Sequence, residues 1–196
     1  MSTILNPTDL DDLARVSPFQ GGPGLRLVGA NGEDNRINGT DSNDRIVGGR
    51  NGDDVIDAGE GNDIVRGKTG NDLIFGGPGD DNIRGGAGRD TLDGGVGDDT
   101  LNGGRGADVI NGGRGANVLK GGGGRDTFVF EFFDGEADTI RDFRTGRDTI
   151  DLSALGATSA NTTYDRSSGE LFVNGELIAD LGNNTRLDLT DDIEFA

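Results

Sequence analysis

A nine-residue spacing of large apolar residues runs through the middle of the chain. From Gly76 to Val129, six consecutive units fit the pattern GGxGxDxUx, in which U is a large apolar residue. Looser copies extend upstream to Gly39, with one extra residue at Gly48, and residues 30–38 form a degenerate unit. The pattern therefore predicts about eleven repeats, whose residues we number from position one to position nine.

A period of nine residues indicates strands rather than a helix. Nine residues make about 2.5 helical turns, so successive U residues of a helix would point to opposite faces. Neighbouring residues of a strand alternate between faces, so a three-residue strand xUx buries only U. We therefore expect a turn over positions one to six and an inward-facing set formed by Ile46, Ile56, Val65, Ile74, Ile83, Leu92, Leu101, Ile110, Leu119 and Phe128.

Two such units complete one coil of 18 residues. Stacked coils would form two parallel sheets that face each other across a thin apolar core, so the predicted fold is all-β, a parallel β-roll. We expect an N-terminal cap at residues 1–28, with a short helix over 7–16. The roll would occupy residues 29–129, and a β-rich region would follow at 130–196. There the pattern predicts a strand through Phe133 and a hairpin turning at Asn174-Gly175.

The glycine-rich turns combine with the position-six carboxylates to predict calcium sites. Ca²⁺ takes six to eight oxygen ligands, more than one turn supplies, but two turns stacked 18 residues apart can provide them. The predicted ligands of one edge are Asp44, Asp63, Asp81 and Asp99, where Asn117 interrupts the acidic position. Those of the other edge are Asp54, Asp72, Asp90, Asp108 and Asp126. Weaker candidates are the backbone carbonyls of Gly77, Gly79, Gly86, Gly88, Gly95, Gly97, Gly104 and Gly106.

Repulsion within each column of carboxylates makes a cation necessary. Stacked strands lie about 4.8 Å apart, and at that spacing two carboxylates repel by about 3.5 kcal/mol at an effective dielectric of about 20. Several such pairs would remove the roughly 5–15 kcal/mol by which a typical domain is stable. We therefore expect a largely unfolded metal-free chain that folds when it binds several Ca²⁺ ions.

Composition narrows the classes of function further. The chain has 36 acidic and 18 basic residues, a net charge of −18, which argues against a nucleic-acid partner. It contains no cysteine for disulfides and no histidine for general-base catalysis or transition-metal binding. No apolar run approaches the roughly 18 residues of a membrane span, and the N-terminus lacks the pattern of a secretory signal peptide.

The array of GGxGxDxUx units resembles the RTX (haemolysin-type) calcium-binding repeats of secreted bacterial proteins, specifically over residues 39–129. Residues 138–155, DTIRDFRTGRDTIDLSAL, are similar to the segment that caps the roll in RTX proteases and alginate-epimerase modules. The resemblance implies Ca²⁺ as cofactor, a secreted, extracellular or cell-surface location, and type I secretion machinery as partner. An uncleaved C-terminal signal would direct export, and the tail at 189–196 is similar to such signals.

The leading hypothesis is a non-catalytic secreted module that folds on Ca²⁺ and supports type I secretion. The alternative is a polysaccharide-binding or adhesive RTX module, of the alginate-epimerase kind. In that case acidic sugars would contact four arginines of the turns, Arg50, Arg89, Arg105 and Arg114. Otherwise these arginines only reduce the repulsion between the carboxylates. An enzyme is disfavoured because the chain has neither histidine nor cysteine and no GxSxG motif.

For two further groups of acidic residues the pattern allows either a role as calcium ligands or a role as solvated charges. The position-five acids Asp53, Asp80 and Asp98 could be extra ligands or solvated charges. The acids that follow the array could form one further site or a solvated strand edge; they are Asp138, Asp142, Asp148 and Asp151.

Overall fold

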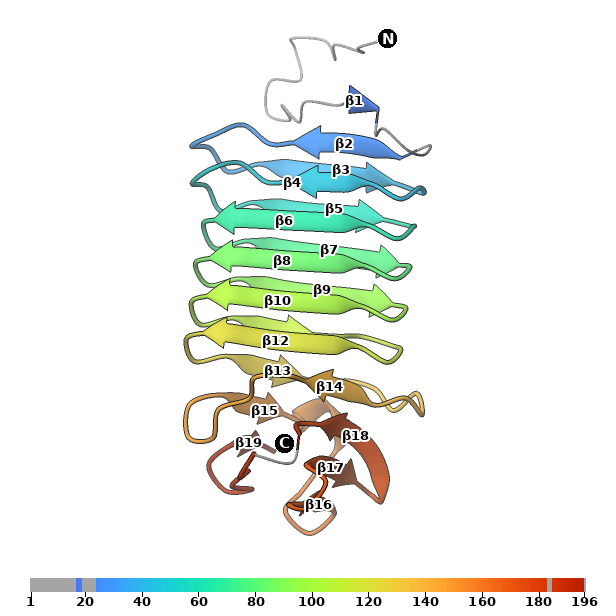
Figure 1. The fold of residues 1–196 in the computed structure, drawn as a ribbon, viewed down its shortest axis with the longest axis vertical. Helices are drawn as coiled ribbons and strands as arrows, with labels where there is room; N and C mark the ends of the chain where they lie inside the picture. The colour runs from blue at the N-terminus through green and yellow to red at the C-terminus, as the bar shows by residue number, and fades with distance from the viewer. Residues whose placement is uncertain (1–16, 19–23, 183–184, 196) are drawn as a thin grey trace.

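The computed structural model describes residues 17–18, 24–182 and 185–195, and it shows a rod built from stacked rungs (Figure 1). The helix expected at residues 7–16 lies outside the described residues. Within them, the only helical element is the short 3-10 helix η1 (Ser153–Leu155), so no described helix is long and apolar enough to cross a membrane.

Two sheets face each other along the rod, and from β2 to β15 the chain alternates between them at every strand (Figure 1). The parallel strands of the first sheet are β2 (Leu25–Val28), β4 (Arg45–Val47), β6 (Ile64–Thr69), β8 (Asn82–Ala87), β10 (Thr100–Arg105), β12 (Val118–Gly123) and β14 (Asp138–Ile140). Those of the second sheet are β3 (Arg36–Thr40), β5 (Val55–Gly59), β7 (Leu73–Pro78), β9 (Thr91–Val96), β11 (Val109–Asn111), β13 (Thr127–Val129) and β15 (Thr149–Asp151). The all-β parallel roll predicted from the repeat is therefore confirmed.

The register places every U residue beside the U residues of the coils before and after it. Leu101 pairs with Ile83 on one side and with Leu119 on the other. All ten predicted inward-facing side chains are completely buried, which confirms the alternation of faces within each strand. The six-residue turn predicted before each strand is too long, because strands such as β8 and β10 continue through the two glycines that follow the apolar residue. The extra residue Gly48 is absorbed in a turn, because Ile46 still pairs with Val65 although 19 residues separate them.

The roll is longer than the repeat motif. About eleven units were expected, but from β2 to β15 the two sheets contain seven strands each, which makes seven coils. Leu27 of β2 stacks on Ile46 before the motif is recognisable, and Ile140 and Ile150 extend the core after it ends. A strand needs only one apolar residue aimed at the core, so it continues where the glycine pattern has been lost.

Further strands, paired in antiparallel and in parallel, lie at both ends of the roll. β1 (Ser17–Pro18) pairs with β2. At the other end β16 (Thr162–Asp165), β17 (Glu170–Val173) and β18 (Glu176–Asp180) form a meander. β18 then pairs with β14, and β19 (Ile193–Glu194) pairs with β15, so the last rung of each sheet has a neighbour.

The hairpin predicted at Asn174-Gly175 is confirmed by the pairing of β17 with β18. The strand predicted through Phe133 is wrong, because β13 ends at Val129. Beyond Phe130, which is buried, the chain leaves the sheet, and the side chain of Asp134 accepts a hydrogen bond from the backbone N–H of Gly115. That contact holds the segment in a loop over the preceding coil.

Candidate metal centre

The turns that connect the two sheets stack in two columns, one along each long edge of the rod. We call the turns that lead into the first sheet the first column; their position-six residues are Asp44, Asp63, Asp81, Asp99 and Asn117. The turns that lead into the second sheet form the second column, with Asp54, Asp72, Asp90, Asp108 and Asp126. The structure places all ten side chains at 3% exposure or less, in the two rows expected from the 18-residue period.

One oxygen of each position-six carboxylate binds the neighbouring coil. The backbone N–H of Asp81 donates to Asp99 Oδ1 at 2.7 Å, and that of Asp72 donates to Asp90 Oδ1 at 2.9 Å. The same bond recurs down both columns, from the Asp44 N–H to Asp63 Oδ1 through the Asp108 N–H to Asp126 Oδ1. These oxygens therefore hold the coils in register and are only partly free for a ligand.

The second oxygen, Oδ2, has no hydrogen-bond partner in six of these carboxylates, although it is buried. They are Asp63, Asp72, Asp81, Asp90, Asp99 and Asp108. A buried charged acceptor without a partner costs at least about 1–3 kcal/mol. The six oxygens therefore require something of positive charge that protein side chains do not provide at these positions.

Asn117 shows what surrounds the Oδ2 position. A Cβ built on the position-one residue Gly112 would overlap Asn117 Nδ2, and one built on Gly94 would overlap Asp99 Oδ2, so the two atoms occupy equivalent places. Asn117 Nδ2 donates to the carbonyl of Gly115, at position four, and to Asp138 Oδ1 in the next turn. At the other turns an aspartate stands at this position, so its Oδ2 takes the place of the amide N–H. It then faces the equivalent carbonyl and carboxylate oxygens with no hydrogen between them.

This donor set fits Ca²⁺. Carboxylates and backbone carbonyls are its usual ligands, and it accepts irregular geometry. Within the described residues no three acidic side chains gather at one point, so an ion would take most ligands from the backbone.

The predicted carbonyl ligands lie where a close approach between turns is possible. The eight glycines have φ angles between 103° and 144°, which favour glycine. A Cβ on Gly97 would overlap the carbonyl oxygen of Gly79, one coil earlier, and a Cβ on Gly95 would overlap that of Gly77. Gly79 and Gly97 lie in stacked turns, whereas Gly77 and Gly95 are paired residues at the ends of β7 and β9. The role of these carbonyls as ligands stays a prediction.

The electrostatics of the columns disfavour ionised carboxylates without a cation. Burial raises the pKa of Asp63, Asp90 and Asp99 to about 7, and repulsion from neighbouring carboxylates adds to the shift. The pKa values of Asp72, Asp81 and Asp108 rise to about 6 for the same first cause. In each case the backbone N–H bond to the carboxylate opposes the shift without cancelling it.

Three of the predicted aspartate ligands differ from the other six because protein donors reach their Oδ2. Asp44 Oδ2 accepts from the backbone N–H of Thr40 at 2.7 Å and from its hydroxyl at 3.0 Å. Asp54 Oδ2 accepts from the N–H of Gly49 at 2.9 Å, and Asp126 Oδ2 accepts from the Arg144 guanidinium at 2.9 Å. The nine aspartates therefore do not form one equivalent set.

The remaining acidic candidates separate into distinct environments. The position-five acids are exposed and bind the next turn outside the core, as when the Asp98 N–H donates to Asp80 Oδ1. The four acids after the array do not form one site. Asp142 accepts from the N–H groups of Gly121 and Gly122, and Asp151 accepts from that of Ser153.

The other two, Asp138 and Asp148, lie at position six of the last turns, one in each column. The backbone N–H of Asn117 donates to Asp138 Oδ1, and that of Asp126 donates to Asp148 Oδ1. Neither turn fits the nine-residue repeat, because Asp138 and Asp148 follow the previous position-six residue of their column by 21 and 22 residues. A signal was available, since residues 146–150 read GRDTI and resemble GRDTL at 88–92 and GRDTF at 124–128.

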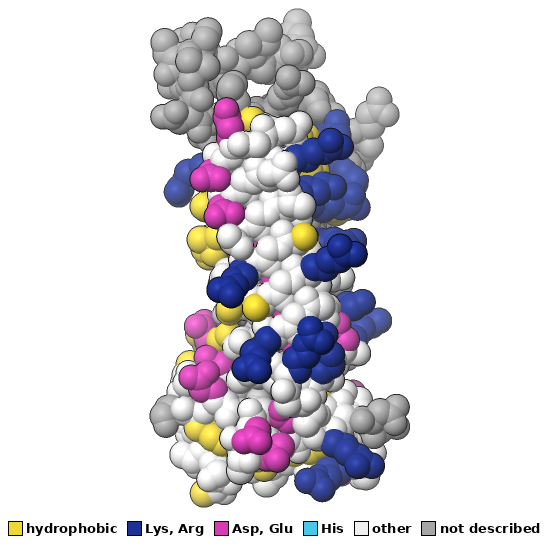
Figure 2. Space-filling view, turned by 90° about the vertical axis from the view of Figure 1, so that its left-hand side faces the viewer, with side chains coloured by type: hydrophobic (Ala, Val, Ile, Leu, Met, Phe, Trp, Pro, Cys, Tyr) yellow, Lys and Arg dark blue, Asp and Glu magenta, His cyan; other side chains and the backbone are white. Residues whose placement is uncertain are grey.

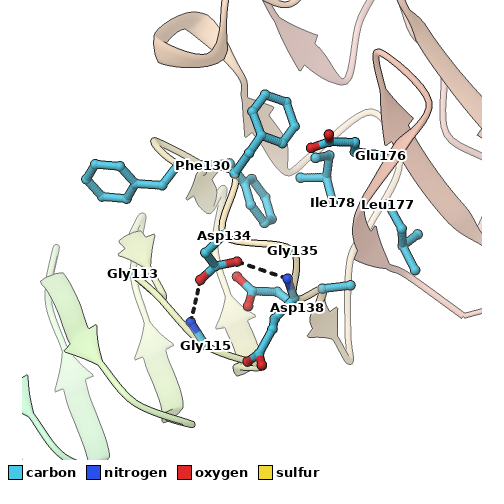
Figure 3. A pocket seen from close by; sticks show the side chains of 13 residues that line it. Gly113, Gly115, Phe130, Asp134, Gly135, Asp138, Glu176, Leu177 and Ile178 are labelled. Atoms are coloured by element: carbon cyan, nitrogen blue, oxygen red, sulfur yellow. Dashed lines mark hydrogen bonds between the residues drawn. The ribbon is translucent and has the colours of Figure 1, made fainter.

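A cavity of about 530 Å³ lies beside the last coils, between the loop at 130–138 and strand β18 (Figure 3). Its carboxylate Asp134 accepts hydrogen bonds from the N–H groups of Gly115, at 2.7 Å, and Glu136, at 3.0 Å. The guanidinium of Arg114 lies 5.4 Å from the ring centre of exposed Phe132. Donors on both oxygens distinguish Asp134 from the six turn aspartates whose Oδ2 has no hydrogen-bond partner.

The family model that matches the chain describes a calcium-binding repeat, in agreement with the oxygen donors of the turns. The family model "RTX calcium-binding nonapeptide repeat (4 copies)" matches residues 29–65, 49–74, 57–92, 66–101, 75–110 and 93–128. The search of curated proteins found no match. One similar solved structure is the AlgE6R3 subunit of the mannuronan C5-epimerase from Azotobacter vinelandii, at 22% identity and a TM-score of 0.22, covering 92% of this chain and 86% of that one.

Proposed function

Because the chain belongs to the family of RTX calcium-binding nonapeptide repeats, we propose that its two turn columns bind several Ca²⁺ ions and that the module itself is non-catalytic. The six buried Oδ2 atoms without a partner support this proposal most directly. On this basis we infer three ion positions in the first column, at Asp63, Asp81 and Asp99. The second column has three more, at Asp72, Asp90 and Asp108.

The ligand chemistry favours calcium over other metals. The chain has no histidine and no cysteine, so the nitrogen and sulfur ligands that zinc prefers are lacking. Mg²⁺ demands a small, near-ideal octahedron and releases its water reluctantly, whereas Ca²⁺ accepts six to eight oxygens in flexible arrangements. Stacked backbone carbonyls with a carboxylate are a flexible arrangement of this kind.

Calcium binding couples to folding and to location in this proposal. Metal-free, the columns contain buried carboxylates that repel one another, so the ion's binding energy contributes to folding. Extracellular calcium modules have Kd values of roughly 10⁻⁴–10⁻³ M, and sites of that affinity stay empty in the cytosol and fill outside the cell. The protein would be exported unfolded through a type I system, with the tail at 189–196 in the signal, and would fold outside.

A calcium titration with a matched pair of variants tests the proposal. Far-UV circular dichroism should show a disordered chain that becomes β near 0.1–1 mM Ca²⁺, the order of magnitude for extracellular sites, and not with Mg²⁺. Calorimetry on Asp99→Asn should show one ion fewer, since asparagine supplies a donor there as Asn117 does. Asp98→Asn, on an exposed neighbour that keeps its acceptor oxygen, should bind the full number. A β spectrum that is indifferent to chelator, with full stoichiometry in Asp99→Asn, would contradict the assignment.

A second candidate function, binding of an acidic polysaccharide, is favoured by the charge on the first sheet. Its outward position-nine side chains include Arg66, Arg84, Lys120 and Arg141, all exposed. Figure 2 shows many of the basic side chains in a column along one side of the rod, while most of the acidic side chains in this view lie elsewhere. In a chain of net charge −18, this row is a local surface that a linear polyanion along the rod could contact.

Retention on immobilised alginate in the presence of Ca²⁺ tests this second function. The triple variant Arg66→Gln/Arg84→Gln/Lys120→Gln should elute at lower salt than the wild type, because rim charges set the ionic-strength dependence of binding. A charge-matched control is Arg125→Gln/Arg147→Gln/Arg166→Gln, which removes three exposed cations that lie neither in this row nor among the turn arginines predicted to contact acidic sugars. Equal elution of the two triple variants would argue against the first sheet as the binding face.

A further inference from the structure

Both turn columns end in N–H donors that the protein supplies itself. In the interior of the columns, Oδ2 of six aspartates has no donor. At the N-terminal ends, Thr40 donates hydrogen bonds to Asp44 Oδ2. The N–H of Gly49, in a turn that is one residue longer, donates to Asp54 Oδ2. At the C-terminal ends the donors belong to Asn117 and Arg144. The contrast between interior and ends is therefore systematic.

Arg144 brings together the oxygens of two consecutive turns in the second column. Its Nη2 donates to Asp126 Oδ2, to Asp148 Oδ1 and to the carbonyl of Gly124, each at 2.9 Å. Its Nε donates to Asp148 Oδ2 at 3.0 Å. Both carboxylates are completely buried, whereas the arginine side chain is 31% exposed and reaches in from outside. One positive group therefore contacts two position-six carboxylates and a position-four carbonyl.

Two asparagines make the same contacts with an amide. Asn117 Nδ2 donates to the position-four carbonyl of Gly115 and to Asp138 Oδ1 of the next turn. Asn35 Nδ2 donates to the position-four carbonyl of Glu33, at 2.9 Å, and to Asp54 Oδ1 of the next turn, at 2.7 Å. Three different side chains thus direct N–H groups at the same pair of acceptors, one carbonyl in a turn and one carboxylate in the turn after it.

The shared pair of acceptors locates the cation position of the interior turns, where no N–H is available. We propose that Asn35, Asn117 and Arg144 are built-in substitutes for a calcium ion that close the array and confine Ca²⁺ to the six interior positions. The proposal rests on the calcium function proposed above. Asparagine acts by removing one negative charge and adding a donor, and Arg144 acts by adding a positive charge between Asp126 and Asp148.

Ion counting on variants that remove a substitute tests the proposal. Asn117→Asp keeps the size of the side chain but replaces its donor with an oxygen, and Arg144→Met removes the charge and all donors. Equilibrium dialysis against saturating Ca²⁺, read by atomic emission, should find one additional ion per chain for each variant. Arg144→Met should also need a higher Ca²⁺ concentration than wild type to reach the β state in circular dichroism, because it lacks the positive charge between Asp126 and Asp148. The matched control Arg147→Met, on an exposed neighbour, should change neither quantity.

The outcomes separate this inference from the calcium function. Wild-type protein that binds no Ca²⁺ would overturn both. Wild-type protein that binds Ca²⁺, with an unchanged ion count in Asn117→Asp, would overturn the inference alone, and this holds even if Arg144→Met fails to fold. Arg144→Lys, which retains the positive charge, should keep the wild-type count; an additional ion in that variant would also contradict the assigned role.

Discussion

Acidification should stabilise the metal-free roll. Burial raises the pKa of Asp99 to about 7, whereas the same carboxyl in an unfolded chain titrates near 3.9. Between these two values the folded state binds a proton that the unfolded state does not, so the free energy of unfolding falls as pH rises. This contribution is fully present below about pH 4 and is lost as the pH rises through about 7.

The size of the effect follows from the shift. One pKa unit corresponds to about 1.4 kcal/mol, so a shift of roughly three units makes the ionised form of Asp99 cost about 4 kcal/mol in the metal-free fold. A typical domain is stable by roughly 5–15 kcal/mol in total. Ionisation of even a few of the six carboxylates is therefore enough to unfold the roll when no cation is bound.

Circular dichroism on protein freed of metal over a chelating resin checks this prediction. The β signal and the unfolding temperature should be higher at pH 5 than at pH 7.5, and saturating Ca²⁺ should reduce the difference. In Asp72→Asn/Asp90→Asn/Asp108→Asn three buried carboxylates no longer titrate, so the pH dependence should become shallower. Metal-free stability that increases from pH 5 to pH 7.5 would refute the reasoning.

Two further predictions concern the turns and the core. Gly94→Ala should weaken calcium binding in calorimetry, because its Cβ would overlap Asp99 Oδ2 and the carbonyl of Gly112. The control Gly123→Ala should bind calcium normally, because its Cβ would meet only the carbonyl of Gly104, at 3.8 Å. Equal binding by the two variants would contradict the crowding argument. Leu101→Ala should lower the free energy of unfolding in saturating Ca²⁺ by about 2–5 kcal/mol in urea titrations, the usual cost of a core cavity. Val96→Ala, at a side chain that is 54% exposed, should change it little, and a similar loss in both would show that burial is not the cause.

The period of the sequence was sufficient to predict the roll. A fixed spacing of U residues determines which side chain faces the core, and residues such as Ile83 and Leu101 then stack without further information. The two columns of position-six residues follow from the same period. Strand β2 and the coil formed by β14 and β15 lie outside the repeat count although the apolar residue remains in each. In β2, Leu25 stands where the repeat has its acid, and Asp138 and Asp148 follow the previous position-six residues of their columns by more than 18 residues.

The difference among the predicted ligands could not be derived from the repeat. Asp44, Asp54 and Asp126 carry the same residue at the same position as the interior aspartates. They differ through donors such as Thr40 and Arg144, and Arg144 lies 18 residues from Asp126 in a segment that does not fit the motif. Whether a carboxylate oxygen lacks a hydrogen-bond donor depends on contacts between turns, which a pattern of residue types does not specify.

Because Asn35, Asn117 and Arg144 close the array at its ends, the interior coils are interchangeable. A gene duplication that repeats residues 76–93 would insert one whole coil whose upper and lower surfaces match those of its neighbours. The rod would become longer by about 4.8 Å. Two ion positions, copies of those at Asp81 and Asp90, would be added while Asn35, Asn117 and Arg144 stayed in place. Relatives of different length can therefore arise by unequal recombination without redesign of either terminus.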